Sequence, residues 1–179
     1  GLGSSSAVTV GLLNALHRFA GNDASPEQLA EEACRIEIDV LGQPIGRQDQ
    51  YAAAFGGVNS ISFGADSVEI NPVKISPYVS KRLSEEFTLV FTGTSRSASE
   101  VLSEVPDDPA DKLARLRVIR GQADAARGLL ESGDIAGMGS LIGEAWDSKR
   151  GISSGISGEK IDSLHSRIMA MGATGAKLL

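Results

Sequence analysis

Residues 1–6 read Gly-Leu-Gly-Ser-Ser-Ser and run directly into an apolar stretch with helical spacing. Two glycines let a backbone turn with positive φ and approach a ligand closely, and small hydroxyl residues are typical of a helix start. The free N–H groups and the positive dipole end of a helix's first turn bind anions such as phosphate. The stretch lacks the Gly-Lys-Ser/Thr ending of a Walker loop and follows no visible strand, as a dinucleotide fingerprint would. It therefore predicts either a phosphate-binding loop or an ordinary helix cap.

Glu37 is the first of two carboxylates that could work beside such a loop. A predicted helix over residues 26–41 places its apolar side chains in one sector, and Glu37 projects into the middle of that sector. An unpaired carboxylate there would be costly, so Glu37 requires a cation, a hydrogen-bond network or a polar cavity. Three interpretations remain open: a side chain that reaches water at the helix edge, a buried salt bridge to an arginine, or a ligand of Mg²⁺. Mg²⁺ takes only one or two carboxylates when phosphates supply its other oxygens.

Asp49 is the second carboxylate, in a glycine-punctuated loop over residues 42–57 that has a short helical centre. A loop in this position can present a carboxylate to a pocket. An aspartate beside a glycine is also typical of a turn or a cap. Both interpretations of Asp49 stay open on the residues alone.

The elements that must position these groups follow from periodicity. A helix over residues 5–19 carries an apolar stripe and is expected to be mostly buried, and a capping box starts the next helix at Ser25. Short strands are expected between residues 58 and 75 and a clear strand at 87–91, which leads into a polar turn and a helix at 97–105. Helices are expected at 111–132, at 134–150 and from 158, with a surface connection or lid at 151–158. The stripe of the first helix comprises Val8, Leu12, Leu13, Ala15, Leu16 and Phe19.

The composition is that of a globular domain, with 41% hydrophobic and 22% charged residues and a net charge of −6. Basic residues are scattered, which argues against nucleic acid, and no apolar run is long enough to span a membrane. Cys34 is the only cysteine, which excludes an intrachain disulfide, and no signal peptide is visible. We therefore expect a cytoplasmic protein with no membrane or nucleic-acid partner. The two histidines are not expected to bind a metal.

Three segments together resemble the GHMP kinases, the superfamily of galactokinase, homoserine kinase, mevalonate kinase and phosphomevalonate kinase. The Gly-Leu-Gly-Ser-Ser-Ser stretch before an apolar helix resembles that family's second signature, which wraps the nucleotide phosphates. The Gly-x-x-Asp-Gln segment from Gly46 to Gln50 resembles a galactokinase-type active site. The run from Gly46 to Gly57 is most similar to the D-glycero-D-manno-heptose 7-phosphate kinases and their fucokinase-like relatives, and Phe-Thr-Gly-x-x-Arg, ending at Arg96, is similar to a segment of the same branch.

The resemblance implies an α+β, two-domain GHMP kinase fold. Residues 1–75 would belong to an N-terminal, ATP-binding domain of ribosomal-protein-like α/β topology, and residues 76–179 to a ferredoxin-like C-terminal domain. The family's first signature and its third, glycine-rich signature are not found in this sequence, so we expect a piece of a longer enzyme, incomplete at both ends.

The resemblance also implies ATP-dependent phosphorylation of a sugar or sugar phosphate, with heptose 7-phosphate and its anomeric hydroxyl as the first expectation. Asp49 would accept the hydroxyl proton, and Ser5 and Glu37 would bind Mg²⁺. A fucokinase or galactokinase-like kinase, a catalytically inactive sugar- and ATP-sensing protein and a structural fragment are the alternatives, and a homo-oligomer is compatible with each. The resemblance assigns phosphate binding to Gly1, Leu2, Gly3, Ser4, Ser5 and Ser6, and substrate binding to Gly46, Arg47, Gln48, Thr92, Gly93 and Arg96.

Overall fold

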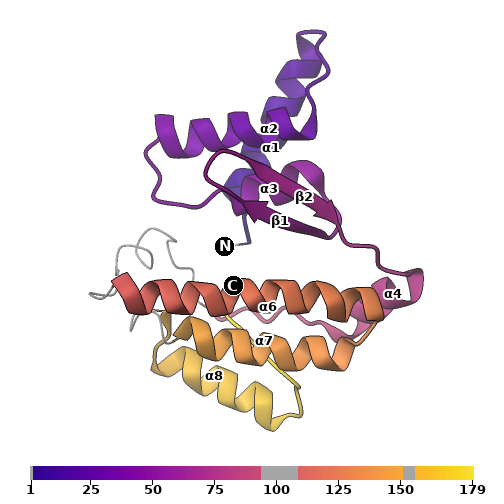
Figure 1. The fold of residues 1–179 in the computed structure, drawn as a ribbon, viewed down its shortest axis with the longest axis vertical. Coiled ribbons are helices and arrows are strands. Elements are labelled where there is room, and N and C mark those ends of the chain that lie inside the picture. The colour runs from indigo at the N-terminus through magenta and orange to yellow at the C-terminus, as the bar shows by residue number, and fades with distance from the viewer. Residues whose placement is uncertain (1, 94–108, 151–155) are drawn as a thin grey trace. The chain divides into compact units, whose positions relative to one another are not determined.

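The structure is a computed structural model that describes residues 2–93, 109–150 and 156–179. These residues form two compact units that meet in the sequence between Pro72 and Val73. Figure 1 shows helices and a hairpin in the first unit and a layered set of helices in the second. Within the described ranges, no helix is both long and apolar enough to cross a membrane.

The first unit is built around two consecutive helical segments, α2 and η1. Helix α1 spans Ser4–Phe19, α2 spans Pro26–Cys34, the π-helix η1 spans Arg35–Val40, and α3 spans Gln48–Phe55. The chain then forms an antiparallel hairpin of β1, Asn59–Phe63, and β2, Val68–Pro72. The predicted helices and the strand region between residues 58 and 75 are confirmed, but the change from α- to π-helical hydrogen bonding was not predicted.

Helix α2 supplies the centre of the first unit's core. Ala30 and Ala33 have no exposed surface, and these small side chains allow neighbouring helices to approach α2 closely. On one side Leu29 and Ala33 pack with Val10 of α1; on the other, Ala30 and Cys34 pack with Tyr51 of α3 and with the hairpin. The start of α2 is fixed by Ser25, whose hydroxyl accepts a hydrogen bond from the backbone N–H of Gln28 at 3.2 Å.

The expectation that the apolar stripe of α1 is mostly buried is wrong for the described structure. Val8, Leu12 and Phe19 are 69%, 58% and 93% exposed, and the buried face of α1 is the opposite one, with Ser6 and Val10. Of the predicted stripe, Leu13 packs half-buried against the Val10 cluster. Periodicity does not reveal which face the neighbouring helices cover, and α2 packs on the side of Val10.

The second unit is helical wherever the structure describes a regular element. Its helices are α4, Pro77–Glu86, α6, Pro109–Ser132, α7, Ile135–Arg150, and α8, Glu159–Ala170. Both boundaries of α6 and α7 and the start of α8 were predicted within two residues. Helix α4 was not predicted; Ser76 caps its start by accepting the N–H of Val79 at 3.2 Å, and Pro77 occupies the first helical position.

The predicted strand at 87–91 is not a strand in the structure. Its residues form no regular element and pair with no strand among the described residues, and Leu89 and Phe91 are 74% and 84% exposed. An apolar, β-branched run forms a strand only when a neighbour completes the ladder. The ferredoxin-like sheet therefore stays a prediction, and the helix expected at 97–105 lies outside the described residues.

The core of the second unit brings α7 against the C-terminal segment. Trp146 of α7 is fully buried, and its ring lies 6.1 Å from the ring of His165 on α8. Gly139, seven residues before Trp146 on α7, faces the backbone of Gly175 and the side chain of Thr174 so closely that a methyl group would overlap Thr174 Oγ1. The absence of a side chain at Gly139 therefore permits this contact.

We expect Gly139→Ala to lower the free energy of unfolding by about 1–3 kcal/mol, because it forces extra volume into a tight contact. Gly128→Ala is the matched control, since Gly128 lies within α6 with no atom within 4 Å of an added Cβ. That change should instead stabilise the protein by about 0.5–1 kcal/mol, because alanine favours the helix. Thermal melting measures both; equal melting temperatures for the two variants would contradict the assignment of Gly139 as a packing position.

Candidate active site

The loop before α1 turns with positive φ at Gly3, as that residue type predicts, and also at Leu2, where it was not predicted. Leu2 and Gly3 both have positive φ, 59° and 64°, and α1 begins directly after them at Ser4. No side chain caps this helix start, and its first turn contains no acidic residue. The N–H groups of the first turn and the positive end of the helix dipole are therefore directed toward whatever approaches residues 2–6.

Asp49 lies directly against this loop. A Cβ added to Gly3 would stand 3.2 Å from Asp49 Cγ and 3.3 Å from Asp49 Oδ2. Asp49 is in the first turn of α3 and is exposed, so its carboxylate is accessible to a ligand at the start of α1. The structure thus places the predicted phosphate loop and the predicted base side by side.

Glu37 is buried, as its place in the helix sector predicts, and only 4% of it is exposed. It belongs to η1, the π-helical segment, in which Leu41 N–H donates to Ile36 C=O at 2.9 Å across the wider turn. Short π-helical segments are frequent at functional sites. With this burial, the interpretation of Glu37 as a side chain that reaches water is excluded.

Three side chains surround the Glu37 carboxylate. Ser6 Oγ donates to Glu37 Oε2 at 2.7 Å, and Gln50 Nε2 donates to the same oxygen at 2.5 Å. Thr9 Oγ1 lies 3.5 Å from Glu37 Oε1 and 3.1 Å from the carbonyl oxygen of Ser5. No arginine of the described residues forms an ion pair with Glu37. The hydrogen-bond network is therefore the environment found, and the salt-bridge interpretation is wrong for the described part of the chain.

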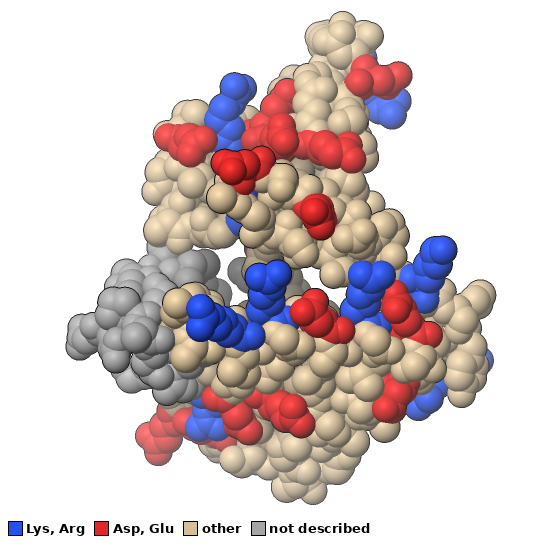
Figure 2. All heavy atoms as spheres, in the orientation of Figure 1, with Lys and Arg blue, Asp and Glu red and all other residues tan. Residues whose placement is uncertain are grey.

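The charge of the first unit constrains how it can bind an anion. Residues 2–72 contain nine aspartates and glutamates, three arginines and no lysine, and Figure 2 shows acidic side chains prominent on the visible face of this unit. Of the arginines, Arg18 pairs with Asp23 at 3.8 Å, and the other two line a separate groove. A phosphate at residues 2–6 would thus depend on backbone N–H groups, the helix dipole and a cation rather than on a basic side chain of residues 2–72.

The carboxylates fit a magnesium ion better than a metal held entirely by protein. Within the described ranges no three histidine, cysteine, aspartate or glutamate side chains gather closely enough to hold a metal. Glu37 Oε1 has only the long contact with Thr9, which leaves a buried carboxylate oxygen without a strong partner. One such oxygen together with phosphate oxygens is a typical ligand set for Mg²⁺.

The remaining predicted site residues divide into three groups. Ser4 and Ser5 are exposed on the first turn of α1, and Gly46 and Gln48 are exposed around the start of α3. Thr92 and Gly93 belong to the second unit, where Gly93 has a φ of 75°. Gly1 and Arg96 lie outside the described residues.

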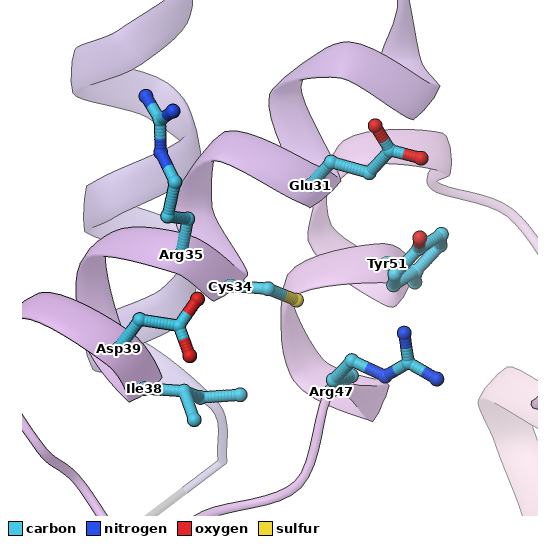
Figure 3. Close-up of a pocket in the computed structure, with 7 residues that line it drawn as sticks. All are labelled: Glu31, Cys34, Arg35, Ile38, Asp39, Arg47 and Tyr51. Carbon is cyan, nitrogen blue, oxygen red and sulfur yellow. The ribbon is translucent and has the colours of Figure 1, made fainter. Parts of the chain in front are cut away.

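Arg47 does not accompany Asp49. It lines a groove of about 330 Å³ between α2, η1 and α3, which neither Glu37 nor Asp49 lines (Figure 3). Its guanidinium lies 5.4 Å from the centre of the Phe63 ring, a cation–π contact that holds the side chain on the hairpin side of α3. The predicted contact of Arg47 with substrate therefore has no support from its position. The groove residues are Glu31, Cys34, Arg35, Ile38, Asp39, Arg47 and Tyr51.

We expect the Cys34 thiol in this groove to react slowly at neutral pH. Burial raises the pKa of the Cys34 thiol above its usual value of 9.0. The positive charge of Arg47 opposes this shift only in part. Alkylation of Cys34 in the folded protein can be followed by mass spectrometry of the peptide that contains it. At pH 7 it should be slower than alkylation of a free thiol, and it should accelerate as the pH rises. The protein unfolded in urea is the control. Equal alkylation rates of Cys34 at pH 7 with and without urea would contradict the expectation.

The sequence interpretation missed three residues of the site: Ser6 as a partner of Glu37, Thr9 and Gln50. The available signal was weak, because Ser6 and Val10 share a face of α1 by their spacing of four, and a polar residue on a buried face requires a partner. Gln50 belongs to the Gly-x-x-Asp-Gln segment, but nothing in that segment indicates a contact with Glu37.

Comparison with known proteins identifies similar chains. Residues 1–57 match the GHMP kinases N terminal domain. A D-glycero-alpha-D-manno-heptose 7-phosphate kinase of Campylobacter jejuni is 29% identical over 180 residues, covering 99% of this chain and 53% of the relative. A bifunctional fucokinase/GDP-fucose pyrophosphorylase of Arabidopsis thaliana is 25% identical over 171 residues, covering 92% of this chain and 16% of the relative.

The fold is also similar to a solved structure. A crystal structure described as a D-glycero-D-manno-heptose 1-phosphate kinase of B. thetaiotaomicron matches with a TM-score of 0.72 and 28% identity, covering 99% of this chain and 49% of the other. The chain thus spans about half the length of the first relative and of this structure.

Proposed function

Because the chain belongs to the GHMP kinase family, we propose that the protein containing it transfers a phosphoryl group from ATP to a sugar or sugar phosphate. Heptose 7-phosphate is the first candidate acceptor, with its anomeric hydroxyl as the attacking group, because heptose kinases align over nearly the whole chain. A fucokinase or galactokinase-like activity is the alternative within the same class.

One observation carries the proposal: the start of α1 lies between two carboxylates. Gly3, immediately before the helix, touches Asp49, and Ser6, in the first turn, donates to Glu37 at 2.7 Å. The proposed phosphate site at the start of α1 is therefore in contact with both carboxylates. Glu37 is suited to Mg²⁺, and Asp49 is suited to accept a proton. Phosphoryl transfer depends mainly on positioning and on neutralising oxygen charge, and these groups are suited to both.

In the proposed reaction the acceptor hydroxyl attacks the γ-phosphorus of ATP. A bond forms between the hydroxyl oxygen and phosphorus, the bond from phosphorus to the β,γ-bridging oxygen breaks, and ADP leaves. Asp49, exposed beside Gly3, accepts the hydroxyl proton. Backbone N–H groups of residues 1–6 hold the phosphates, and Gly46 and Gln48, which flank Asp49 closely in sequence, contact the acceptor. Thr92, Gly93 and Arg96 remain proposed acceptor contacts.

Glu37 would hold Mg²⁺, together with Ser5, which is exposed on the same turn of α1 as Ser6. The fit rests on Glu37 itself, a buried carboxylate with one weakly contacted oxygen and no cationic partner among the described residues. When bound, the ion would neutralise charge on the phosphate oxygens. Ser6 and Gln50 donate to Glu37 as neutral groups, so they satisfy one carboxylate oxygen without supplying a positive charge.

The experiment that tests the proposal is a coupled ADP-release assay on the full-length protein with Mg-ATP. The acceptors are heptose 7-phosphate, fucose, galactose and mevalonate, each alone. We expect ADP release to depend on a single sugar, with heptose 7-phosphate the most active. Turnover with mevalonate alone would overturn the sugar assignment. Thermal stabilisation by ATP without turnover of any acceptor would favour a sugar- and ATP-sensing protein and overturn the catalytic one.

A further inference from the structure

The two oxygens of the Glu37 carboxylate are treated differently by the protein. Both short hydrogen bonds, from Ser6 Oγ at 2.7 Å and from Gln50 Nε2 at 2.5 Å, end on Oε2. Oε1 has only Thr9 Oγ1 at 3.5 Å, and that hydroxyl is closer to the Ser5 carbonyl oxygen, at 3.1 Å. The protein therefore fixes one oxygen firmly and leaves the other available.

The contact of Gln50 with Glu37 leaves another polar atom of Gln50 buried without a partner in the described structure. The Gln50 side chain has no exposed surface, and its Oε1 has no hydrogen-bond partner in the described structure. A buried carbonyl oxygen without a partner loses its hydrogen bonds to water, whereas an apolar side chain of similar volume would avoid that loss. Because a carboxylate can only accept, the amide nitrogen must face Glu37, and the orphaned oxygen is the consequence.

Gln50 is adjacent to Asp49 in the sequence and donates to Glu37, so it connects the two carboxylates of the site. Gln50 follows Asp49 in the first turn of α3, so one turn of helix directs Asp49 to Gly3 and Gln50 to Glu37. The bond from Gln50 to Glu37 is thus a direct side-chain link between α3 and η1. Replacing Gln50 would remove one of the hydrogen bonds that orient Glu37, while both carboxylates, Glu37 and Asp49, would remain.

We propose that Gln50 is a positioning residue whose amide holds Glu37 Oε2, so that Oε1 is presented as a metal ligand. The inference rests on the proposed binding of Mg-ATP. Partners that orient a metal ligand through hydrogen bonds typically contribute about 10–100-fold in metal affinity, which sets the size of the expected effect.

The test is Gln50→Met in the full-length protein, because methionine has similar volume and no donor. We expect the Mg²⁺ concentration for half-maximal turnover to rise about 10-fold or more. Affinity for ATP without divalent metal should be unchanged, since residues 1–6 are untouched. Electron paramagnetic resonance of Mn²⁺ in the presence of ATP supplies a readout independent of turnover, and should show weakened binding to the same extent. Gln28→Met is the matched control: Gln28 Nε2 donates to Glu32 Oε1 at 2.8 Å, an exposed amide–carboxylate pair outside the site.

Unchanged Mn²⁺ affinity in Gln50→Met, or a fall in kcat at every Mg²⁺ concentration with the metal dependence intact, would overturn the role of Gln50. Should this variant fail to fold, Ser6→Ala removes the other donor to Oε2 and is expected to weaken Mn²⁺ binding in the same direction; wild-type affinity there would overturn the inference. Failure of the proposed function is distinct, because the wild-type protein itself would then show no metal-dependent binding of ATP.

Discussion

Asp49→Asn should lower turnover by about 10²–10⁴-fold, the range that a positioned general base contributes. Asparagine preserves the shape of the side chain beside Gly3 but cannot accept the proton of the acceptor hydroxyl. Because backbone N–H groups of residues 1–6 would hold the phosphates, the affinity for Mg-ATP should stay within about 2-fold of the wild type. ADP release measures the first quantity, and calorimetric titration with a non-hydrolysable ATP analogue measures the second.

Asp39→Asn is the control for this substitution. Asp39 is also an exposed aspartate at the end of a helical segment, but it lines the groove with Arg47 rather than the loop with Gly3. Its replacement should leave turnover unchanged. Near-normal turnover in Asp49→Asn would remove Asp49 from the chemistry, and a loss of ATP binding in that variant would make it a binding residue instead.

Glu37→Gln should reduce turnover about 100-fold at limiting Mg²⁺, equivalent to about 2.7 kcal/mol of transition-state stabilisation. The amide can still accept from Ser6 and Gln50 through its oxygen, so the buried hydrogen bonds survive while the charge is lost. A buried carboxylate with no cationic partner among the described residues is costly even when hydrogen-bonded, so the melting temperature should be equal to or higher than that of the wild type.

The combination of preserved stability and lost activity is the signature of a functional charge. Glu31→Gln provides the comparison, since Glu31 is exposed on α2, the helix directly before η1, and lines the groove, so its replacement should affect neither property. A marked fall in the melting temperature of Glu37→Gln without a change in Mg²⁺ dependence would instead identify Glu37 as a structural residue.

Local sequence patterns predicted the positions of helices more successfully than the neighbours against which each element packs. The helices at residues 4–19, 26–40 and 135–150 follow from spacing and capping, which are properties of neighbouring residues. Burial of Leu12 and pairing of residues 87–91 were predicted wrongly, because both depend on what lies next to the segment. Periodicity contains no information on that neighbour.

The candidate site shows the same division. The burial of Glu37 followed from its angle on the helix, and the conformation of Gly3 followed from its residue type. The contact between Gly3 and Asp49, and the choice of Ser6 rather than Ser5 as the partner of Glu37, required the packing of three helical segments. Such contacts join residues 31 or more positions apart, and no local pattern specifies them.

The most direct test of the site is a crystal structure of the full-length protein with Mg²⁺ and a non-hydrolysable ATP analogue. We predict phosphate oxygens within hydrogen-bond distance of the backbone N–H groups at the start of α1, and a metal ion coordinated by Glu37 Oε1. The Asp49 carboxylate should lie on the same side, facing the γ-phosphate. Phosphates bound elsewhere, with Glu37 still enclosed by Ser6 and Gln50 and no metal beside it, would contradict the account.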